Sequence, residues 1–211
     1  MHSPSRIENG GCLRVLGVDP ASAGATGYGV IELDGSRARA LHFGALCLPA
    51  RTEFDERLRR IHDLIAKLLE EFQPEAMAVE GVFAALNVRT ALKLAEVRGV
   101  ILLAAAQAGI PSHSYSPREV KVSVTGYGAA SKQQMQQMIR ALLGLRECPE
   151  PPDAADGMAV ALCHAHFARA AQRLAASEMK LSAAAKSRVR YAAGAAKAPG
   201  RLFANRLSRG R

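Results

Sequence analysis

The sequence predicts an α/β domain in which helices cover both faces of a mixed, five-stranded sheet, followed by a basic tail. Three short apolar runs follow one another near the amino terminus with only turns between them. After them, segments with helical periodicity alternate with two further short apolar runs, a pattern typical of layered α/β folds. Apolar residues make up 49% of the 211 residues and charged residues 22%, which suffices for one buried core.

The first three strands are expected to form a meander. Residues 13–18 are mostly apolar and end at Asp19, after which the small-residue segment PASAGATG indicates a turn. Strands at 28–33 and 41–48 follow, separated by a short polar turn. The polar residues 1–12 are expected to be a leader outside the fold.

Helices and two more strands are expected beyond the meander. Residues 53–72 carry apolar side chains at helical spacing, and Pro74 ends the helix. A short apolar run at 76–79 delivers Glu80 to the end of a fourth strand. The remaining elements are expected as a helix at 87–108, a strand at 112–116, a flexible loop at 122–130, a helix at 131–143 and a long helix from 153 onward.

Positive charge is concentrated at the carboxyl terminus. The formal net charge is +9, yet residues 167–211 hold eleven Lys and Arg against one acid, so the rest of the chain carries a net charge of −1. We therefore expect a folded domain over 13–176 and a tail over 177–211. The tail is rich in Ala, Gly and Ser, which predicts disorder when free and sequence-independent attraction to DNA phosphates.

Targeting signals and a cysteine framework are not expected. No apolar run reaches the roughly 18 residues needed to cross a bilayer, and residues 1–12 lack the apolar stretch of a signal peptide. The four cysteines form no C-x-x-C pair, which argues against a zinc site or a disulfide framework. The sequence therefore predicts a cytoplasmic protein with no membrane segment and with reduced thiols.

Four carboxylates stand at positions suited to one site. Asp19 and Glu80 end the first and fourth predicted strands, and Asp153 and Asp156 share a face near the start of the last helix. If the two strands are parallel neighbours, their ends meet where open α/β sheets place their sites. Each acid also has an ordinary structural interpretation, as a turn residue, a surface carboxylate or a helix cap.

The chemistry of four clustered acids is that of a divalent metal. Like charges raise one another's pKa, and hard cations between the oxygens make such a cluster favourable. This implies magnesium, or manganese in its place. Two such ions about 3.5–4 Å apart can activate a water and stabilise the leaving oxygen of a phosphodiester, as nucleases do.

Five segments in the same order give the sequence a family resemblance: VLGVDPASAGATGYGVIEL, AVEGVF, ALKLAEVRGV, REVKVSVTGYGAASKQQMQ and DAADGMAVALCHAH. Together they resemble the RuvC-type Holliday-junction resolvases of bacteria over about residues 13–166. The resemblance implies an RNase H-like fold and a homodimer that uses magnesium to nick two opposed strands of a four-way DNA junction. It also implies the branch-migration proteins RuvA and RuvB as partners.

The resemblance assigns roles to individual residues. Asp19, Glu80, Asp153 and Asp156 match the metal-binding catalytic acids, Lys121 and Lys132 match basic positions beside the scissile phosphates, and Phe83 matches an aromatic that engages unpaired bases. The sequence departs from the family where the D-P-G-S turn reads Asp19-Pro20-Ala21-Ser22 in a longer segment, and where Leu86 replaces a basic residue. The change at Leu86 bears on the strength or the sequence preference of junction binding.

Three further cations are candidate DNA contacts. Arg89 and Lys93 are four residues apart on one predicted helix, and Arg118 lies three residues before Lys121. Phosphate binding requires such cations, although scattered Lys and Arg are more often a solvated surface.

Two other classes of protein remain open at this point. The sugar-kinase and actin-type ATPases share a strand meander and a small-residue phosphate turn, but they need two such lobes. A non-catalytic module that binds branched nucleic acid would use the same acids as caps and turns.

Overall fold

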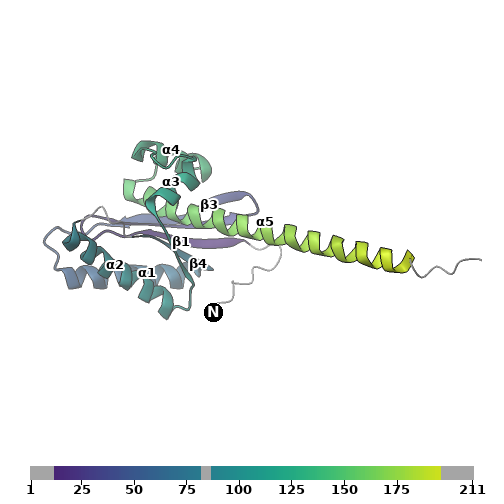
Figure 1. The fold of residues 1–211 in the computed structure, drawn as a ribbon. Coiled ribbons are helices and arrows are strands. Elements are labelled where there is room, and N and C mark those ends of the chain that lie inside the picture. Colours follow the sequence, from purple (N-terminus) through teal and green to yellow (C-terminus); the bar gives the residue numbers. More distant parts are fainter. Residues whose placement is uncertain (1–11, 82–86, 196–211) are drawn as a thin grey trace, which may run out of the picture. The chain divides into compact units, whose positions relative to one another are not determined.

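The computed structural model describes residues 12–81 and 87–195, with side chains as far as residue 180. The chain divides into two units, Met1–Ala168 and Arg169–Arg211. One helix, α5 (Pro152–Ala195), contains the boundary between them (Figure 1). The sequence placed the end of the folded domain at residue 176, eight residues later.

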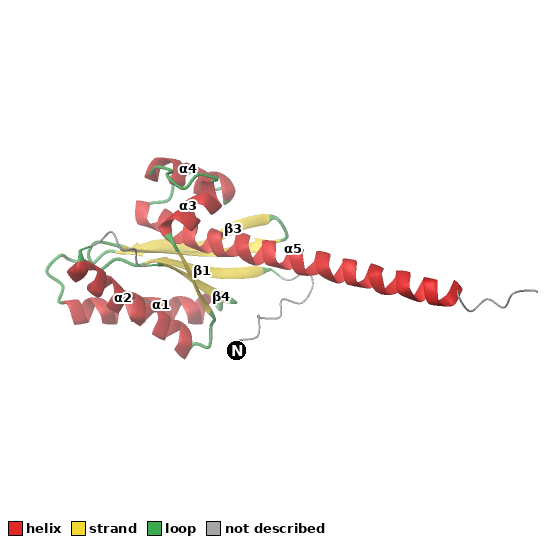
Figure 2. Cartoon of the chain, viewed as in Figure 1, coloured by secondary structure: helices red, strands yellow, loops and turns green. Residues whose placement is uncertain are grey.

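The first unit contains the predicted mixed sheet, in the order β3-β2-β1-β4-β5 (Figure 2). Strands β1 (Leu13–Asp19), β2 (Thr26–Asp34) and β3 (Arg37–Leu46) form the antiparallel meander. Strands β4 (Ala76–Glu80) and β5 (Ser112–Tyr115) are parallel to β1, with β4 directly beside it. The predicted fold class is confirmed.

Helices cover both faces of the sheet, which makes three layers (Figure 1). On one face lie α1 (Phe54–Phe72) and α2 (Val88–Gln107), and their buried side chains share a core with Leu16, Val18 and Val79. The opposite face is covered by the first part of α5 together with α3 (Pro117–Thr125) and α4 (Lys132–Leu142).

Helices α3 and α4 both begin with a capping box, in which a serine side chain and the side chain three residues later satisfy each other's backbone N–H groups. Ser116 pairs in this way with Glu119, and Ser131 pairs with Gln134. The sequence predicted α4 and its Ser131 cap. It does not predict α3, because the glycines at 126 and 128 indicate a loop over 122–130. Gly126, with φ of 76°, ends α3 instead of disrupting it.

Glycines allow α5 to approach the sheet closely. A Cβ atom on Gly17 or Gly29 would overlap the α5 backbone near Ala161 and Met158, and one on Gly27 would overlap the carbonyl of Asp153. The strands therefore present a channel without side chains, and the start of α5 lies in it. This channel fixes the depth at which Asp153 and its neighbours sit above β1 and β2.

Helix α5 continues to Ala195, through residues 177–195 that the composition predicted to be disordered. Alanine, lysine and arginine are good helix formers, and extending an existing helix avoids the cost of nucleation. The rest of the predicted tail and the leader residues 1–11 lie outside the described residues. Within the described part, no helix is long and apolar enough to cross a membrane.

An ion-pair cluster around the buried Glu32 side chain holds the meander to α1. The Glu32 carboxylate accepts hydrogen bonds from Arg14 at 3.0 Å and from Arg39 at 2.9 Å, and its side chain is only 8% exposed. Arg14 also donates to the backbone carbonyl of Phe72, at the end of α1. The two guanidinium groups lower the pKa of Glu32 below its ordinary value.

We predict that Glu32→Gln lowers the free energy of unfolding at pH 7 by about 1–3 kcal/mol, because two arginines lose a charged partner in a partly buried site. A carboxyl whose folded pKa is depressed stabilises the protein above its unfolded pKa and loses this effect as pH falls. The melting-temperature gap between variant and wild type should therefore shrink below about pH 4.5.

The matched control is Glu56→Gln, because Glu56 pairs with Arg59 and Arg60 on the exposed side of α1. Exposed pairs are screened by solvent and contribute little, so this change should have the smaller effect. Equal losses from both variants would contradict the role assigned to Glu32.

Candidate active site

Asp19 and Glu80 lie side by side at the ends of two parallel strands. The register pairs Val18 of β1 with Val79 of β4, so the acids that follow each valine are neighbours. Both valines are buried in the core under α1 and α2. Because side chains alternate along a strand, Asp19 and Glu80 point to the opposite face, toward α5.

The other two acids come from the first two turns of α5. Lys132, the first residue of α4, reaches both: its Nζ lies 3.1 Å from Oδ2 of Asp156 and 3.7 Å from Oδ1 of Asp153. The lysine side chain is still 54% exposed. It therefore faces the acids from the solvent side and retains room to move.

A cleft of about 320 Å³ joins three of the four acids, Asp19, Glu80 and Asp156. Asp153 does not line this cleft and lies beside it, next to Lys132. Its polar lining comes from Asp19, Glu80, Asp156, Lys121 and Lys132, contributed by β1, β4, α5, α3 and α4. The apolar remainder of the lining is Pro117, Val120, Met135 and Ala159. Two strands, β1 and β4, and three helices, α3, α4 and α5, thus meet at one end of the sheet.

Burial and mutual repulsion raise the pKa values of Asp19, Glu80 and Asp156. The pKa of Asp19 rises to about 8, first through burial and then through the charges of Glu80, Asp156 and Asp153. The pKa of Glu80 rises to about 7, through burial and the charge of Asp156. Burial also raises the pKa of Asp156, although the hydrogen bond from Lys132 opposes it. The same hydrogen bond raises the pKa of Lys132.

The charge balance of the cleft fits a hard divalent cation. Two lysines face four carboxylates, so the fully ionised cluster is short of positive charge. Carboxylate oxygens are the ligands that magnesium prefers. Within the part of the chain that the structure describes, no three His, Cys, Asp or Glu side chains are close enough together to form a ready-made metal site. The carboxylates lie near one another, but their oxygens do not converge on a single position where a cation would sit. Their mutual repulsion opposes a closer approach.

The predicted DNA contacts are distributed over two regions. Lys121 and Lys132 line the cleft, and Arg118 is exposed one turn before Lys121 on α3. Arg89 and Lys93 are exposed on α2, on the other face of the sheet from α3, and the Lys93 ammonium lies 5.2 Å from the centre of the Phe54 ring. Phe83 and Leu86 fall in 82–86, outside the described residues.

The sequence analysis missed Tyr115. This residue ends β5, pairs in register with Glu80, and accepts the backbone N–H of Gly81 with its carbonyl oxygen at 2.8 Å. Its hydroxyl lies 2.8 Å from Nδ1 of the buried His164 on α5. Tyr115 thus ties the Glu80 strand to α5. The pattern SHSY signalled a strand, but nothing in it signalled this contact.

Comparison with known proteins agrees with this architecture. Residues 15–164 match the family described as crossover junction endodeoxyribonuclease RuvC. The protein of that name from Syntrophomonas wolfei is 45% identical over 168 residues, which are 80% of this chain and 97% of the relative. The one from Chloroflexus aggregans is 47% identical over 165 residues, 78% of this chain and 100% of the relative.

A solved structure extends the agreement to three dimensions. Thermus thermophilus RuvC in complex with Holliday junction substrate superimposes with a TM-score of 0.70 at 37% identity, covering 75% of this chain and 96% of that one. The chain therefore belongs to the RuvC family of crossover junction endodeoxyribonucleases, and the RNase H-like fold implied by the resemblance is confirmed. This membership decides against the sugar-kinase and actin-type alternative.

The raised pKa of Asp19 predicts a pH-dependent stability. An acid whose pKa is higher in the folded protein than in the unfolded chain makes folding less favourable as pH rises from its unfolded to its folded value. Between about pH 4 and pH 8, the wild type should therefore lose stability that Asp19→Asn retains. Melting curves without divalent cations should show the variant as the more stable protein at pH 8.

The control is Asp34→Asn, a change at an exposed aspartate that ends β2. It should leave the pH profile of the wild type unaltered. If Asp19→Asn follows the same profile as the wild type, Asp19 is not held among like charges.

Proposed function

We propose that this chain is a metal-dependent endonuclease that resolves four-way DNA junctions during recombination and repair, by paired nicks in opposed strands. The observation that supports this most is the meeting of Asp19, Glu80 and Asp156 with two lysines in one cleft of a RuvC-family fold. Such a site provides what phosphodiester hydrolysis needs: oxygen ligands for cations, positive charge for the phosphate, and an opening to solvent.

Four residues would hold the cofactor: Asp19, Glu80, Asp153 and Asp156. We propose magnesium, with two ions per site and manganese as a substitute. When bound, the cations supply an activated water and stabilise the leaving oxygen of the scissile phosphodiester. The carboxylates are suited to this because the positive charge offsets the repulsion among them.

The lysines complete the site. Lys132 pairs with Asp153 and Asp156 in the structure, yet its side chain is more than half exposed. Once cations neutralise the acids, its ammonium group is available to the phosphate. There it stabilises the negative charge that grows in the transition state. Lys121, on the α3 side of the cleft, binds the phosphate backbone.

Junction DNA would bind over the face of the protein on which the cleft opens. Arg118 and Lys121 both lie on α3, so the DNA strand that enters the cleft would cross this helix. Phe83, three residues after Glu80, would stack on unpaired bases, a contact worth about 1–3 kcal/mol per base. Arg89 and Lys93, on α2, would contact a different part of the junction.

The α2 surface supports a homodimer. Val88, Leu92 and Leu103 are 75%, 60% and 52% exposed and recur along one side of the helix. A two-fold dimer through this surface presents the same cleft to two opposed strands, which suits the near two-fold symmetry of a four-way junction. RuvA and RuvB remain the proposed branch-migration partners, and the cytoplasm the proposed location.

The acids give the main prediction. Asp19→Asn, Asp153→Asn and Glu80→Gln should each slow nicking of a labelled junction by more than about 100-fold, since an amide keeps the shape but loses the charge that holds the cation. Junction affinity in a gel-shift assay should survive. Nicking at the wild-type rate in saturating magnesium would remove that residue from the metal site. Binding by the wild type without magnesium-dependent nicks would favour the non-catalytic module.

A change at Lys132 should affect the cleavage rate more than the affinity for the junction. Lys132→Ala should reduce the single-turnover cleavage rate by about 10²–10³-fold, the range typical for loss of one transition-state donor, and weaken binding much less. Lys67→Ala, at an exposed position on α1, is the control and should change neither. Equal losses in rate and affinity would make Lys132 a general phosphate contact.

The dimer gives a third prediction. Leu92→Glu places a charge in the exposed apolar stripe of α2, so it should yield a monomer by analytical ultracentrifugation. Nicks in the two opposed strands should then lose their coupling. Glu96→Gln, also exposed on α2, is the control. A Leu92→Glu variant that remains dimeric would place the interface elsewhere.

A further inference from the structure

The second unit carries the whole net positive charge of this chain. Residues 169–211 contain eleven Lys and Arg and one acid, whereas residues 1–168 have a net charge of −1. The catalytic unit can hold phosphates at short range through its cleft lysines. It offers no net positive field to attract DNA over a distance.

This unit also lies beyond the part of the chain that the family explains. The family match ends at residue 164, and the Chloroflexus aggregans relative is covered completely by 165 of the 211 residues. The function proposed for the first unit therefore assigns no role to residues 169–211.

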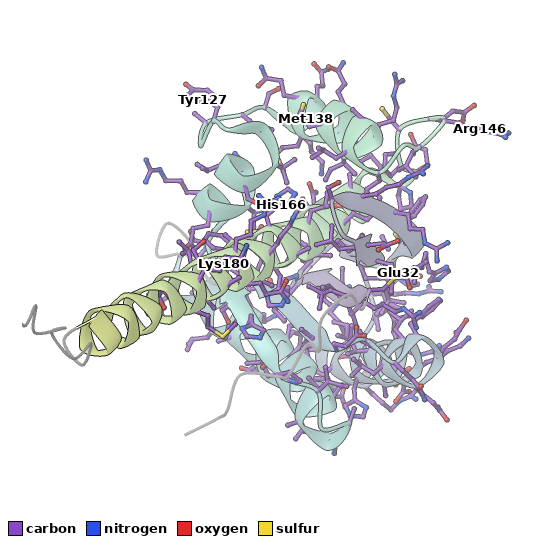
Figure 3. All side chains as sticks on the ribbon, turned by 90° about the vertical axis from the view of Figure 1, so that its right-hand side faces the viewer. Glu32, Tyr127, Met138, Arg146, His166 and Lys180 are labelled. Atoms are coloured by element: carbon purple, nitrogen blue, oxygen red, sulfur yellow. The ribbon has the colours of Figure 1, made fainter. Side chains whose placement is uncertain are left out.

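Helix α5 arranges the described cations of this unit on one side. Arg169, Arg173 and Lys180 fall within about 40° of one another at 100° per residue. Arg173 and Lys180 are exposed, and Arg169 is partly exposed. Among the described residues none of the three forms an ion pair. Glu178, the one acid of the unit, lies on the opposite side of the helix. The view along α5 in Figure 3 shows Lys180 on this helix, with the ribbon running on past it.

The composition of the helix selects the class of partner. Its large exposed apolar side chains in the described part of this unit are Leu174 and Met179, and the other apolar residues of 169–180 are four alanines. This is too little apolar area to insert into a bilayer or to form a stable helical seam. Exposed cations along one side of a helix are instead suited to the phosphates of DNA.

We infer that α5 beyond residue 168 is a second DNA-binding element, in which Arg169, Arg173 and Lys180 contact the phosphate backbone of plain duplex DNA. The contact is independent of sequence and of the crossover, so it keeps the enzyme on the duplex arms on which a junction lies. The inference extends the proposed function. It does not depend on nicking, because it concerns duplex that the cleft does not cut.

The test uses the full chain and an uncut DNA duplex without divalent cations. Arg173→Gln/Lys180→Gln removes two exposed cations and keeps good helix formers in their place. If both contact phosphates, the slope of log affinity against log salt should fall by about 1.8, since each neutralised phosphate contributes about 0.9. Arg173→Glu/Lys180→Glu should weaken binding further. Circular dichroism verifies that the helix is retained.

Two controls locate the effect. Arg37→Gln/Lys67→Gln removes the same charge from exposed positions of the first unit and should leave the slope unchanged. Leu174→Gln/Met179→Gln alters the apolar side chains of the same helix segment and should also leave it unchanged. Loss of DNA binding in this apolar pair alone would overturn the inference in favour of apolar docking.

Other outcomes are equally decisive. Equal slopes for the wild type, the Gln pair and the Glu pair would overturn the inference. So would charge-dependent binding to phosphatidylserine vesicles that exceeds binding to duplex. If instead the slope falls as expected in a protein that never nicks a junction, the DNA-binding element stands and the proposed nuclease activity fails.

Discussion

Repulsion among buried carboxylates is the constraint on which the rest of this structure depends. Asp19 and Glu80 sit where burial and neighbouring charges raise their pKa values to about 8 and about 7. A protein selected for stability alone would place apolar or neutral groups there. Lys132 offsets part of the repulsion through Asp156 and Asp153, but its single charge leaves the cleft short of positive charge. We propose that cations held by the acids offset the rest of this repulsion.

The architecture around the cleft holds the acids in place against that repulsion. Parallel pairing of β1 and β4 sets Asp19 beside Glu80. Glycines in β1 and β2 admit the start of α5, so the helix brings its two acids down to the same edge. The serine caps of α3 and α4 fix where each helix begins, and with it the positions of the two cleft lysines.

Much of this was predictable because it follows from local pattern. The strand run before Asp19, the short run before Glu80 and the Ser131 cap are each visible in a few residues. The bond between Tyr115 and His164 joins residues 49 apart and has no local signature. Helix α3 was missed because Gly126 was taken as part of a loop. The helix over 177–195 was missed because composition predicts disorder without accounting for a helix already formed upstream.

The most direct test of the central claim is anomalous diffraction from crystals of the full chain soaked in manganese. This account predicts anomalous density in the cleft, bounded by the carboxylates of Asp19, Glu80 and Asp156, with the Lys132 ammonium displaced from Asp156. Manganese bound only elsewhere, with Lys132 still paired to Asp156, would contradict it. The four acids would then be caps and turn residues that burial happens to bring together.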